Sequence, residues 1–205
     1  MEPRAITEIN ARVAEAGFAV LNLQTAAAAA ALAERLGTVL EVTEVRLGNG
    51  RTYLSSAGSI PAHTDHPAAR LILWYCQRAD GGGAGANLLV DARSVIRALP
   101  AGIVEELAGV ELHCPSVHTL VPAETHPLYR LHGKHVFYAP WLCAEPRSEA
   151  LLAFEAEIAK PEQCCTILLR QGEGLLVDNR RMLHLRDALP PKSTRWLTRY
   201  WIGDS

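Results

Sequence analysis

The chain has little of what marks several large classes of protein. Its five cysteines are odd in number and include no Cys-x-x-Cys pair, so the 205 residues suggest neither a disulfide framework nor a zinc knuckle. No apolar run approaches the roughly 20 residues that a membrane helix needs. Lys and Arg total 20 against 22 for Asp and Glu, so the net charge of -2 provides no broad basic field. We therefore expect neither nucleic acid nor a membrane as a partner.

The N-terminal residues, MEPRAITEINARV, carry acids early and lack the apolar stretch of a signal peptide. This pattern predicts a cytoplasmic protein. Almost half of the residues, 49%, are apolar, which is enough to build one core in a chain of this length.

Helical signals are concentrated near the N-terminus. Thr7 is expected to cap a helix that ends before Gly17, and Thr25 a second, alanine-rich helix that ends at Gly37. A short strand, FAVLNL, lies between them. After this part, short apolar strands alternate with Gly, Pro and Asn, and helices are expected only at 94–107 and 147–159.

This order of elements predicts a mainly β fold with flanking helices, a double-stranded β-helix of the jelly-roll, cupin-like kind. We expect one domain over residues 1–205, with an N-terminal helical flank at 1–38 and a jelly-roll core with insertions at 39–205. The glycine-rich segment DGGGAGAN, at 80–87, is not followed by the Gly-Lys-Ser/Thr of a phosphate loop. It is interpreted as a hairpin turn.

The segment PAHTDHPAARLILW places two histidines and an aspartate at the mouth of an apolar strand. Residues two apart on an extended segment point to the same face, so His63 and Asp65 would lie side by side while Thr64 faces away. Such a pair alone is weak evidence, because it is more often a salt-bridged surface turn. In GLLVDNRRMLHLRDAL, however, two strands joined by a turn deliver His184 as a third ligand. Two histidines and one carboxylate leave three octahedral positions open on one face, as in non-haem Fe(II) enzymes.

Two arginines follow on the last strand. In STRWLTRYWI, Arg195 and Arg199 are four residues apart and share one face. Buried arginines that face a cavity require carboxylate or phosphate partners. Arg186, two residues after His184, is expected to form an ion pair with Asp178 or Asp187.

Five segments, HTDH, LLVDA, THPLYRLHGKHVFYAPW, LLVDNRRMLHLR and RWLTRYW, follow one another between about residues 53 and 202. In this order they resemble the taurine dioxygenase and clavaminate synthase-like group of Fe(II)/2-oxoglutarate-dependent oxygenases. The resemblance implies that His63, Asp65 and His184 bind Fe(II). It also implies that Arg195, eleven residues after His184, holds the distal carboxylate of 2-oxoglutarate. The implied reaction uses molecular oxygen to oxidise, most simply to hydroxylate, an unactivated carbon, and it releases succinate and CO2.

Two positions carry further expectations. Asn87 stands where this group usually has Thr, and its amide is expected to donate to the 2-oxoglutarate carboxylate. Arg199 matches the arginine that contacts the substrate sulfonate in taurine dioxygenase, which predicts a substrate contact and an acidic group on the substrate. The alternative for Arg199 is a structural pair with an acid such as Asp91 or Asp178. The chain is short for the group, and trimmed loops at 42–60 and 113–143 suggest an open pocket for a small-molecule or carrier-bound substrate.

Two other functions are weighed against the oxygenase. A cupin-like module could bind a ligand without turnover, although a scaffold of that kind has no physical reason to bury arginines. A zinc-dependent hydrolase with an HxHxDH motif needs a histidine two residues before His63, where this chain has Pro61. The sequence determines neither the primary substrate nor the oligomeric state.

Overall fold

A computed structural model describes residues 3–48, 53–116 and 123–204 of the chain. Its α-helices are α1 (Pro3–Ala16), α2 (Ala26–Leu36), α3 (Ala92–Ala98), α4 (Ala101–Gly109) and α5 (Glu149–Ile158). Short 3₁₀ turns lie at Tyr53–Ser55, Pro140–Leu142 and Pro161–Gln163. No helix within these described ranges is long and apolar enough to cross a membrane.

The strands form two main sheets and two small hairpins. The five-stranded sheet has the order β1 (Phe18–Asn22), β11 (Glu173–Asp178), β4 (Leu71–Arg78), β13 (Trp196–Ile202), β2 (Val39–Arg46). The four-stranded sheet has the order β10 (Cys164–Ile167), β5 (Asn87–Asp91), β12 (Met182–Arg186), β3 (Ile60–His63). The hairpins are β6 (Glu111–Cys114) with β7 (Glu124–Pro127), and β8 (Tyr129–Arg130) with β9 (His135–Val136).

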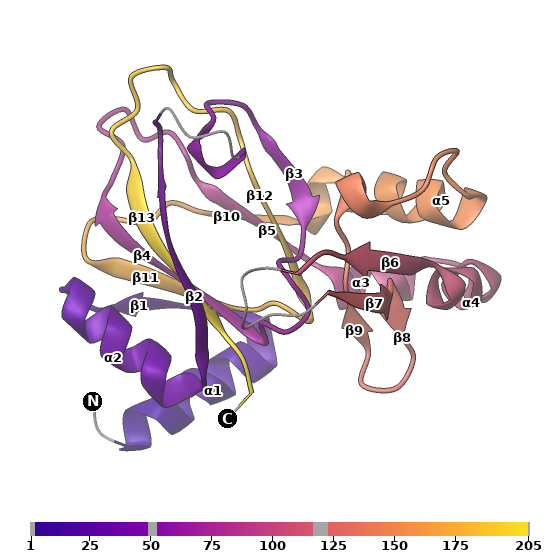
Figure 1. Cartoon of the computed structure of the whole chain (residues 1–205), viewed down its shortest axis with the longest axis horizontal. Coiled ribbons are helices and arrows are strands. Elements are labelled where there is room, and N and C mark those ends of the chain that lie inside the picture. The colour runs from indigo at the N-terminus through magenta and orange to yellow at the C-terminus, as the bar shows by residue number, and fades with distance from the viewer. Residues whose placement is uncertain (1–2, 49–52, 117–122, 205) are drawn as a thin grey trace.

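Strand β4, in the middle of the five-stranded sheet, is buried on both faces, and this explains its uninterrupted apolar sequence from Leu71 to Cys76. Leu71, Leu73 and Tyr75 pack with α1 and α2, whereas Ile72 and Trp74 face the core between the two sheets. A strand covered on both faces loses the usual alternation of apolar and polar residues. Figure 1 shows α1 and α2 along one side of this sheet. The predicted mainly β fold with flanking helices, a double-stranded β-helix, is confirmed.

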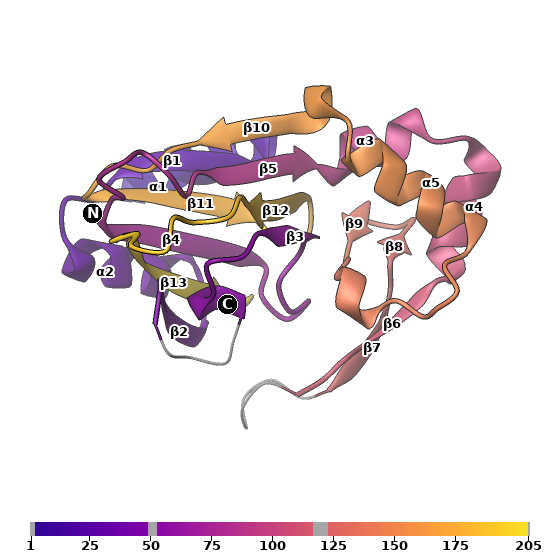
Figure 2. The same cartoon turned by 90° about the horizontal axis from the view of Figure 1, so that it is seen from above.

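A second group of elements lies apart from the N-terminal helices. Helices α3, α4 and α5 gather with β6–β9 on the opposite side of the two main sheets (Figure 1, Figure 2). They share a hydrophobic cluster around Phe154, Leu107 and Leu128, each fully buried. The chain leaves the four-stranded sheet after β5 and returns to it at β10, so this lobe is an insertion into the jelly roll.

Thr25 caps its helix as expected, whereas Thr7 does not. The side chains of Thr25, Asp91 and Ser148 each accept a hydrogen bond from a backbone N–H of the helix that they precede. Helix α1, however, begins at Pro3 and not at Thr7. Proline fits the first turn of a helix because its missing N–H would have no intrahelical partner there.

Two further expectations about local structure are wrong. The glycine-rich segment at 80–87 is not a hairpin turn, because β4 and β5, which it joins, belong to different sheets. Hydrophobic pattern alone does not tell a turn within a sheet from a crossing between sheets. The segments expected as trimmed loops contain strands: β2 pairs with β13, and β6 pairs with β7.

Asn179 fixes the turn that follows β3. Its side-chain Oδ1 accepts the Asp65 backbone N–H at 2.8 Å, and its Nδ2 donates to the Ala69 carbonyl at 2.8 Å. Longer contacts from the same Nδ2 reach the carbonyls of Asp65 and His66, both at 3.3 Å. The Asn179 side chain therefore takes the place of a strand partner for a segment that has left the sheet.

Replacing Asn179 with Ala should lower the free energy of unfolding by about 2 to 4 kcal/mol, because buried backbone groups at 65–69 would lose their partners. Urea unfolding measures the change. The matched control is Asn10→Ala, at an exposed position of α1, which should cost no more than about 0.5 kcal/mol. Equal, small losses for both variants would show that the turn is held by other contacts.

Candidate metal centre

The antiparallel pairing of β3 with β12 brings two histidines together. His63, the last residue of β3, lies directly opposite His184 of β12. Their ring centroids are 4.2 Å apart, and the Trp74 ring lies 4.9 Å from that of His184. Two residues separated by more than a hundred positions thus become cross-strand neighbours.

Asp65 reaches the two histidines because Thr64, between it and His63, turns away from them. The Thr64 backbone N–H donates to the Tyr138 carbonyl at 2.7 Å, and its Oγ1 accepts the Tyr138 N–H at 3.0 Å. Asp65 then faces the two imidazoles, with its Oδ2 3.6 Å from His184 Nε2. One ligand atom from each of His63, Asp65 and His184 lies within 4.8 Å of the others, and all three residues are buried. The structure therefore brings together the three residues predicted as metal ligands.

The electrostatics of this group suit a metal. Burial lowers the pKa of both histidines, for His184 to about 3 with the neighbouring His63 as a further cause, so both imidazoles are neutral at pH 7. Burial acts to raise the pKa of Asp65, but Arg199 and the two histidines together hold it below its ordinary value. Neutral imidazoles and an ionised carboxylate are the forms that bind metal ions.

The donor set fits a divalent metal at this point. The buried Oδ2 of Asp65 has no hydrogen-bond partner within the described structure. The Nδ1–H of His63 donates to the Pro61 carbonyl at 2.8 Å, which leaves its Nε2 as the ligand atom. Fixing one ring nitrogen by a carbonyl is the usual way in which proteins set the tautomer of a metal-binding histidine.

Arg199 is engaged by two acids. Its Nη1 donates to Asp65 Oδ1 at 2.9 Å, and its Nη2 donates to Glu41 Oε1 of β2 at 3.3 Å. The guanidinium also lies over the Trp201 ring, 4.8 Å from the centroid. Arg199 therefore forms a structural pair with acids, as in the alternative reached from the sequence, but its partners are Asp65 and Glu41 and not Asp91 or Asp178. The substrate contact predicted for Arg199 stays a prediction.

Arg195 and Asn87, both expected to contact 2-oxoglutarate, lie side by side. The Arg195 Nη2 donates to Asn87 Oδ1 at 2.9 Å, while the buried Nδ2 of Asn87 has no partner in the described ranges. Gly85, with φ +78°, leaves room for the arginine, since a Cβ there would lie 2.5 Å from Arg195 Cδ. Burial and then the charge of Arg186 lower the pKa of Arg195 to about 10, so it remains protonated at neutral pH.

Arg186 does not form the expected ion pair. Its Nη2 donates to the carbonyls of Ser56 and Gly58 at 2.8 and 2.7 Å. Its Nε and Nη1 are buried without a partner in the described structure. Asp178 is directed elsewhere, because it accepts the backbone N–H of Arg180 in the turn after β11. Arg186 therefore ties the 56–58 segment to the sheet beside the centre.

Three cavities surround this centre. The first, the arginine cavity, is lined by His63, His184, Asn87, Arg186, Arg195 and Arg199, among others. The second, the aromatic cavity of about 130 Å³, is lined by Asp65 together with Phe137, Trp141, Leu142 and Trp201, among others. The three ligand residues are thus divided between two cavities, and a metal among them would be accessible from both.

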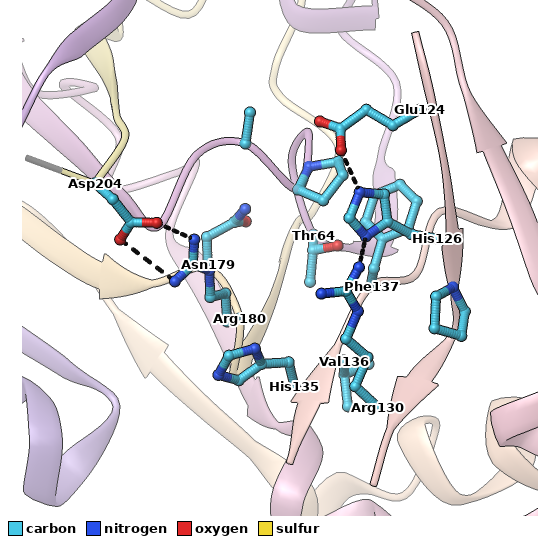
Figure 3. A pocket seen from close by; sticks show the side chains of 13 residues that line it. Thr64, Glu124, His126, Arg130, His135, Val136, Phe137, Asn179, Arg180 and Asp204 are labelled. Carbon is cyan, nitrogen blue, oxygen red and sulfur yellow. Dashed lines mark hydrogen bonds and ion pairs between the residues drawn. The ribbon is translucent and has the colours of Figure 1, made fainter. Parts of the chain in front are cut away.

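The third cavity, of about 310 Å³, is polar and is shown in Figure 3. Glu124, His126 and Arg130 lie on one side of it and Arg180 and Asp204 on the other. Arg130 donates to His126 Nδ1 at 3.0 Å, so the Nε2–H of His126 donates to Glu124 at 2.6 Å. Arg180 is paired with Asp204 at 2.7 Å. The cavity reaches Thr64 but none of the three ligand residues.

Comparison with known proteins agrees with this geometry. The model of the taurine catabolism dioxygenase TauD, TfdA family matches residues 2–201. The chain belongs to this family. The resemblance inferred from the sequence is therefore confirmed, and the TauD, TfdA family assignment makes the protein a dioxygenase. No curated protein matches the chain at a significant level.

Solved structures show that this TauD, TfdA family member also shares its fold with known oxygenases. An asparagine oxygenase in complex with Fe(II), a hydroxyasparagine and succinate has a TM-score of 0.77 at 20% identity over 98% of this chain and 78% of that chain. A taurine dioxygenase from Burkholderia xenovorans has a TM-score of 0.75 at 19% identity, covering 100% and 83%. AAD-2 in complex with Mn(II) and N-oxalylglycine has a TM-score of 0.75 at 15% identity, covering 100% and 89%.

Sequence reasoning missed three residues that complete the centre of this family member. Glu41, on the edge strand β2, contacts Arg199, and Asn179 holds the turn that carries Asp65. Trp141 places its ring 5.0 Å from that of His63. The position of Asn179 in a turn just before the strand of His184 is the one signal in the sequence that could have indicated its role.

Replacing Arg199 with Lys should weaken metal binding by about 10- to 100-fold, the loss typical of groups that orient a metal ligand. A single ammonium cannot hold Asp65 and Glu41 as the two arms of a guanidinium do. Competition with a chromogenic chelator measures Mn(II) affinity. Arg181→Lys is the matched control, because Arg181 forms a similar pair with Asp91 at 2.6 Å away from the centre. Unchanged metal affinity with impaired substrate turnover would instead support the substrate contact predicted from the sequence.

Proposed function

We propose that His63, Asp65 and His184 hold Fe(II) and that the protein oxidises a small molecule with 2-oxoglutarate as co-substrate. The observation that carries this proposal is the buried set of two neutral imidazoles and one carboxylate, with ligand atoms within 4.8 Å of one another. Membership of the TauD, TfdA family supports it. The complexes of similar solved structures with Fe(II) and succinate, or with Mn(II) and N-oxalylglycine, agree with it.

The overall reaction consumes molecular oxygen and 2-oxoglutarate. One oxygen atom enters succinate as CO2 leaves, and the other enters the substrate, most simply converting a C–H bond into C–OH. When bound, Fe(II) supplies the redox chemistry for oxygen activation. The chain supplies an incomplete set of ligands from one side, so that positions remain for co-substrate and oxygen.

The chain's own residues orient this ligand set. Arg199 binds Oδ1 of Asp65, which leaves Oδ2 for the metal and favours one-oxygen ligation. The Pro61 carbonyl fixes the His63 ring, and Trp74 packs against His184. A ligand set that is already held in place loses little conformational entropy when a metal binds.

We assign the arginine cavity to 2-oxoglutarate. Arg195 is buried, and among the described residues no carboxylate lies within ion-pair distance of it. An unpaired buried cation favours a carboxylate ligand, and the unpartnered Nδ2 of Asn87 offers a second donor beside it. The same cavity touches His63 and His184, as a co-substrate that also binds the metal requires.

The nature of the substrate and the location of the protein are separate questions. Solved relatives are described as acting on asparagine and taurine, which supports a small-molecule substrate. An acidic group on the substrate, a carrier-bound substrate and a cytoplasmic location stay predictions. Neither a non-catalytic module nor a zinc-dependent hydrolase is favoured by a specific contact in the described structure.

Anaerobic addition of Fe(II) and then 2-oxoglutarate should produce the visible charge-transfer band of a metal–keto acid chelate. His63→Ala and His184→Ala should abolish the band, because each removes a ligand that no neighbouring donor replaces. The variant Glu124→Gln, in the polar cavity, serves as the control and should keep the band. A wild-type protein that binds Fe(II) but gives no band with 2-oxoglutarate would rule the proposal out.

Arg195→Lys and Asn87→Ala should both weaken 2-oxoglutarate binding when the chelate band is titrated. Removing the Asn87 amide should cost about 1 to 3 kcal/mol, as for a hydrogen bond to a charged group. Arg195→Lys keeps the charge but loses the two-pronged contact, so a loss of at least about tenfold is expected. Arg97→Lys, on the exposed side of α3, is the control. Unchanged titrations for both site variants would place the co-substrate elsewhere.

A further inference from the structure

The aromatic cavity gives access to the centre from a different side than the arginine cavity. Of the three cavities, the arginine cavity is assigned to the co-substrate, and the polar cavity reaches none of the three ligand residues. The aromatic cavity is lined by Asp65 itself. This step rests on the proposed function, because it takes the arginine cavity as occupied by 2-oxoglutarate.

The walls of the aromatic cavity are apolar on most sides. Trp141 and Leu142 come from the 3₁₀ turn of the inserted lobe, Phe137 from the segment before it, and Trp201 from β13. Cys114, Pro115 and Ala139 add small apolar surfaces. Trp141 is unusual in that its side chain is 51% exposed although its ring lies 5.0 Å from that of His63. A large, half-exposed aromatic next to a metal ligand is poorly accounted for by core packing alone.

The polar residues of these walls are Thr64, Asp65 and the buried His66. No arginine or lysine among the described residues lines the aromatic cavity. Arg199, the nearest candidate, lines the arginine cavity and is bound by Asp65 and Glu41. An acidic group in the aromatic cavity would lose its hydration without gaining a counter-charge from an arginine or lysine of the described walls. It would also face the carboxylate of Asp65.

We propose that the part of the substrate that is oxidised is an apolar aryl or alkyl group, held against Trp141 and Trp201. The cavity of about 130 Å³ is close in size to an engineered apolar cavity of about 150 Å³ that binds benzene. It therefore accommodates about one six-membered ring or an alkyl chain of similar volume. Polar groups of the substrate lie outside this cavity, and the oxidised carbon belongs to the ring or chain next to Asp65.

Benzyl alcohol and 2-aminoethanesulfonate are suitable probes, one an uncharged molecule with a ring and the other a small sulfonate zwitterion without a ring. Their binding is measured by isothermal titration calorimetry, with and without anaerobic Fe(II) and 2-oxoglutarate. Benzyl alcohol should bind saturably at one site and perturb the charge-transfer band, whereas 2-aminoethanesulfonate should do neither. The band without any probe reports on the proposed function alone, and the isotherms report on the cavity.

Trp141→Ala should raise the dissociation constant of benzyl alcohol by about tenfold, because it removes one aromatic wall. Trp141 is half exposed, so this variant should remain folded, which its thermal transition checks. Leu152→Ala, at a position of α5 that is 54% exposed and outside the cavity, is the matched control and should not change the constant.

Two results would overturn the inference. One is saturable binding of 2-aminoethanesulfonate that perturbs the band while benzyl alcohol has no effect. The other is benzyl alcohol binding with the same affinity in Trp141→Ala and wild type, which would place the ring outside the aromatic cavity. In both cases the chelate band formed without any probe, on which the proposed function depends, would be unchanged.

Discussion

Burial of one carboxylate is the constraint on which the centre depends. Asp65 is 4% exposed, and a buried charge left alone would cost several kcal/mol. An ion pair with Arg199 of β13 offsets this cost. The Arg199 guanidinium is equally buried, and it binds Glu41 of β2 as well. The pairing of β2 with β13 thereby becomes part of the metal centre. The two histidines come from the four-stranded sheet and Asp65 from the turn after β3, whereas the arginine that compensates the Asp65 charge comes from the five-stranded sheet.

The two sheets also separate two kinds of environment around the ligand residues. His63 and His184 line the arginine cavity, which holds buried arginines. Asp65 lines the aromatic cavity, whose rings are supplied mainly by the inserted lobe. On the proposed assignment, an anionic co-substrate and an apolar substrate group would approach the metal from different directions. Electrostatic attraction is strengthened in the first cavity because its arginines are buried, and the second offers mainly dispersion contacts.

The inserted lobe takes part in the centre through its backbone as well as its rings. The Tyr138 backbone holds Thr64 in place, so the direction in which Asp65 points depends on a segment of the lobe. On the other side of the same turn, Asn179 binds the backbone from Asp65 to Ala69. The short segment between β3 and β4 is thus fixed from two sides, although it pairs with no strand along its length.

Local pattern alone determined much of this protein. Alternation along an extended segment was enough to place His63 and Asp65 on one face with Thr64 turned away, and the cap residue Thr25 marked where a helix begins. These features depend only on residues that are close together in the sequence, so they can be predicted without the tertiary structure.

Tertiary structure alone decided which partners the charged residues found. The sequence showed that Arg199 must meet an anion, but its two acids, Asp65 after β3 and Glu41 of β2, lie within its reach only once β13 pairs with β2 and the two main sheets come together. Arg186 met carbonyls of the 56–58 segment and no carboxylate. The glycine-rich segment crossed between sheets for the same reason: long-range pairing sets which strand comes next in space, and no local pattern encodes it.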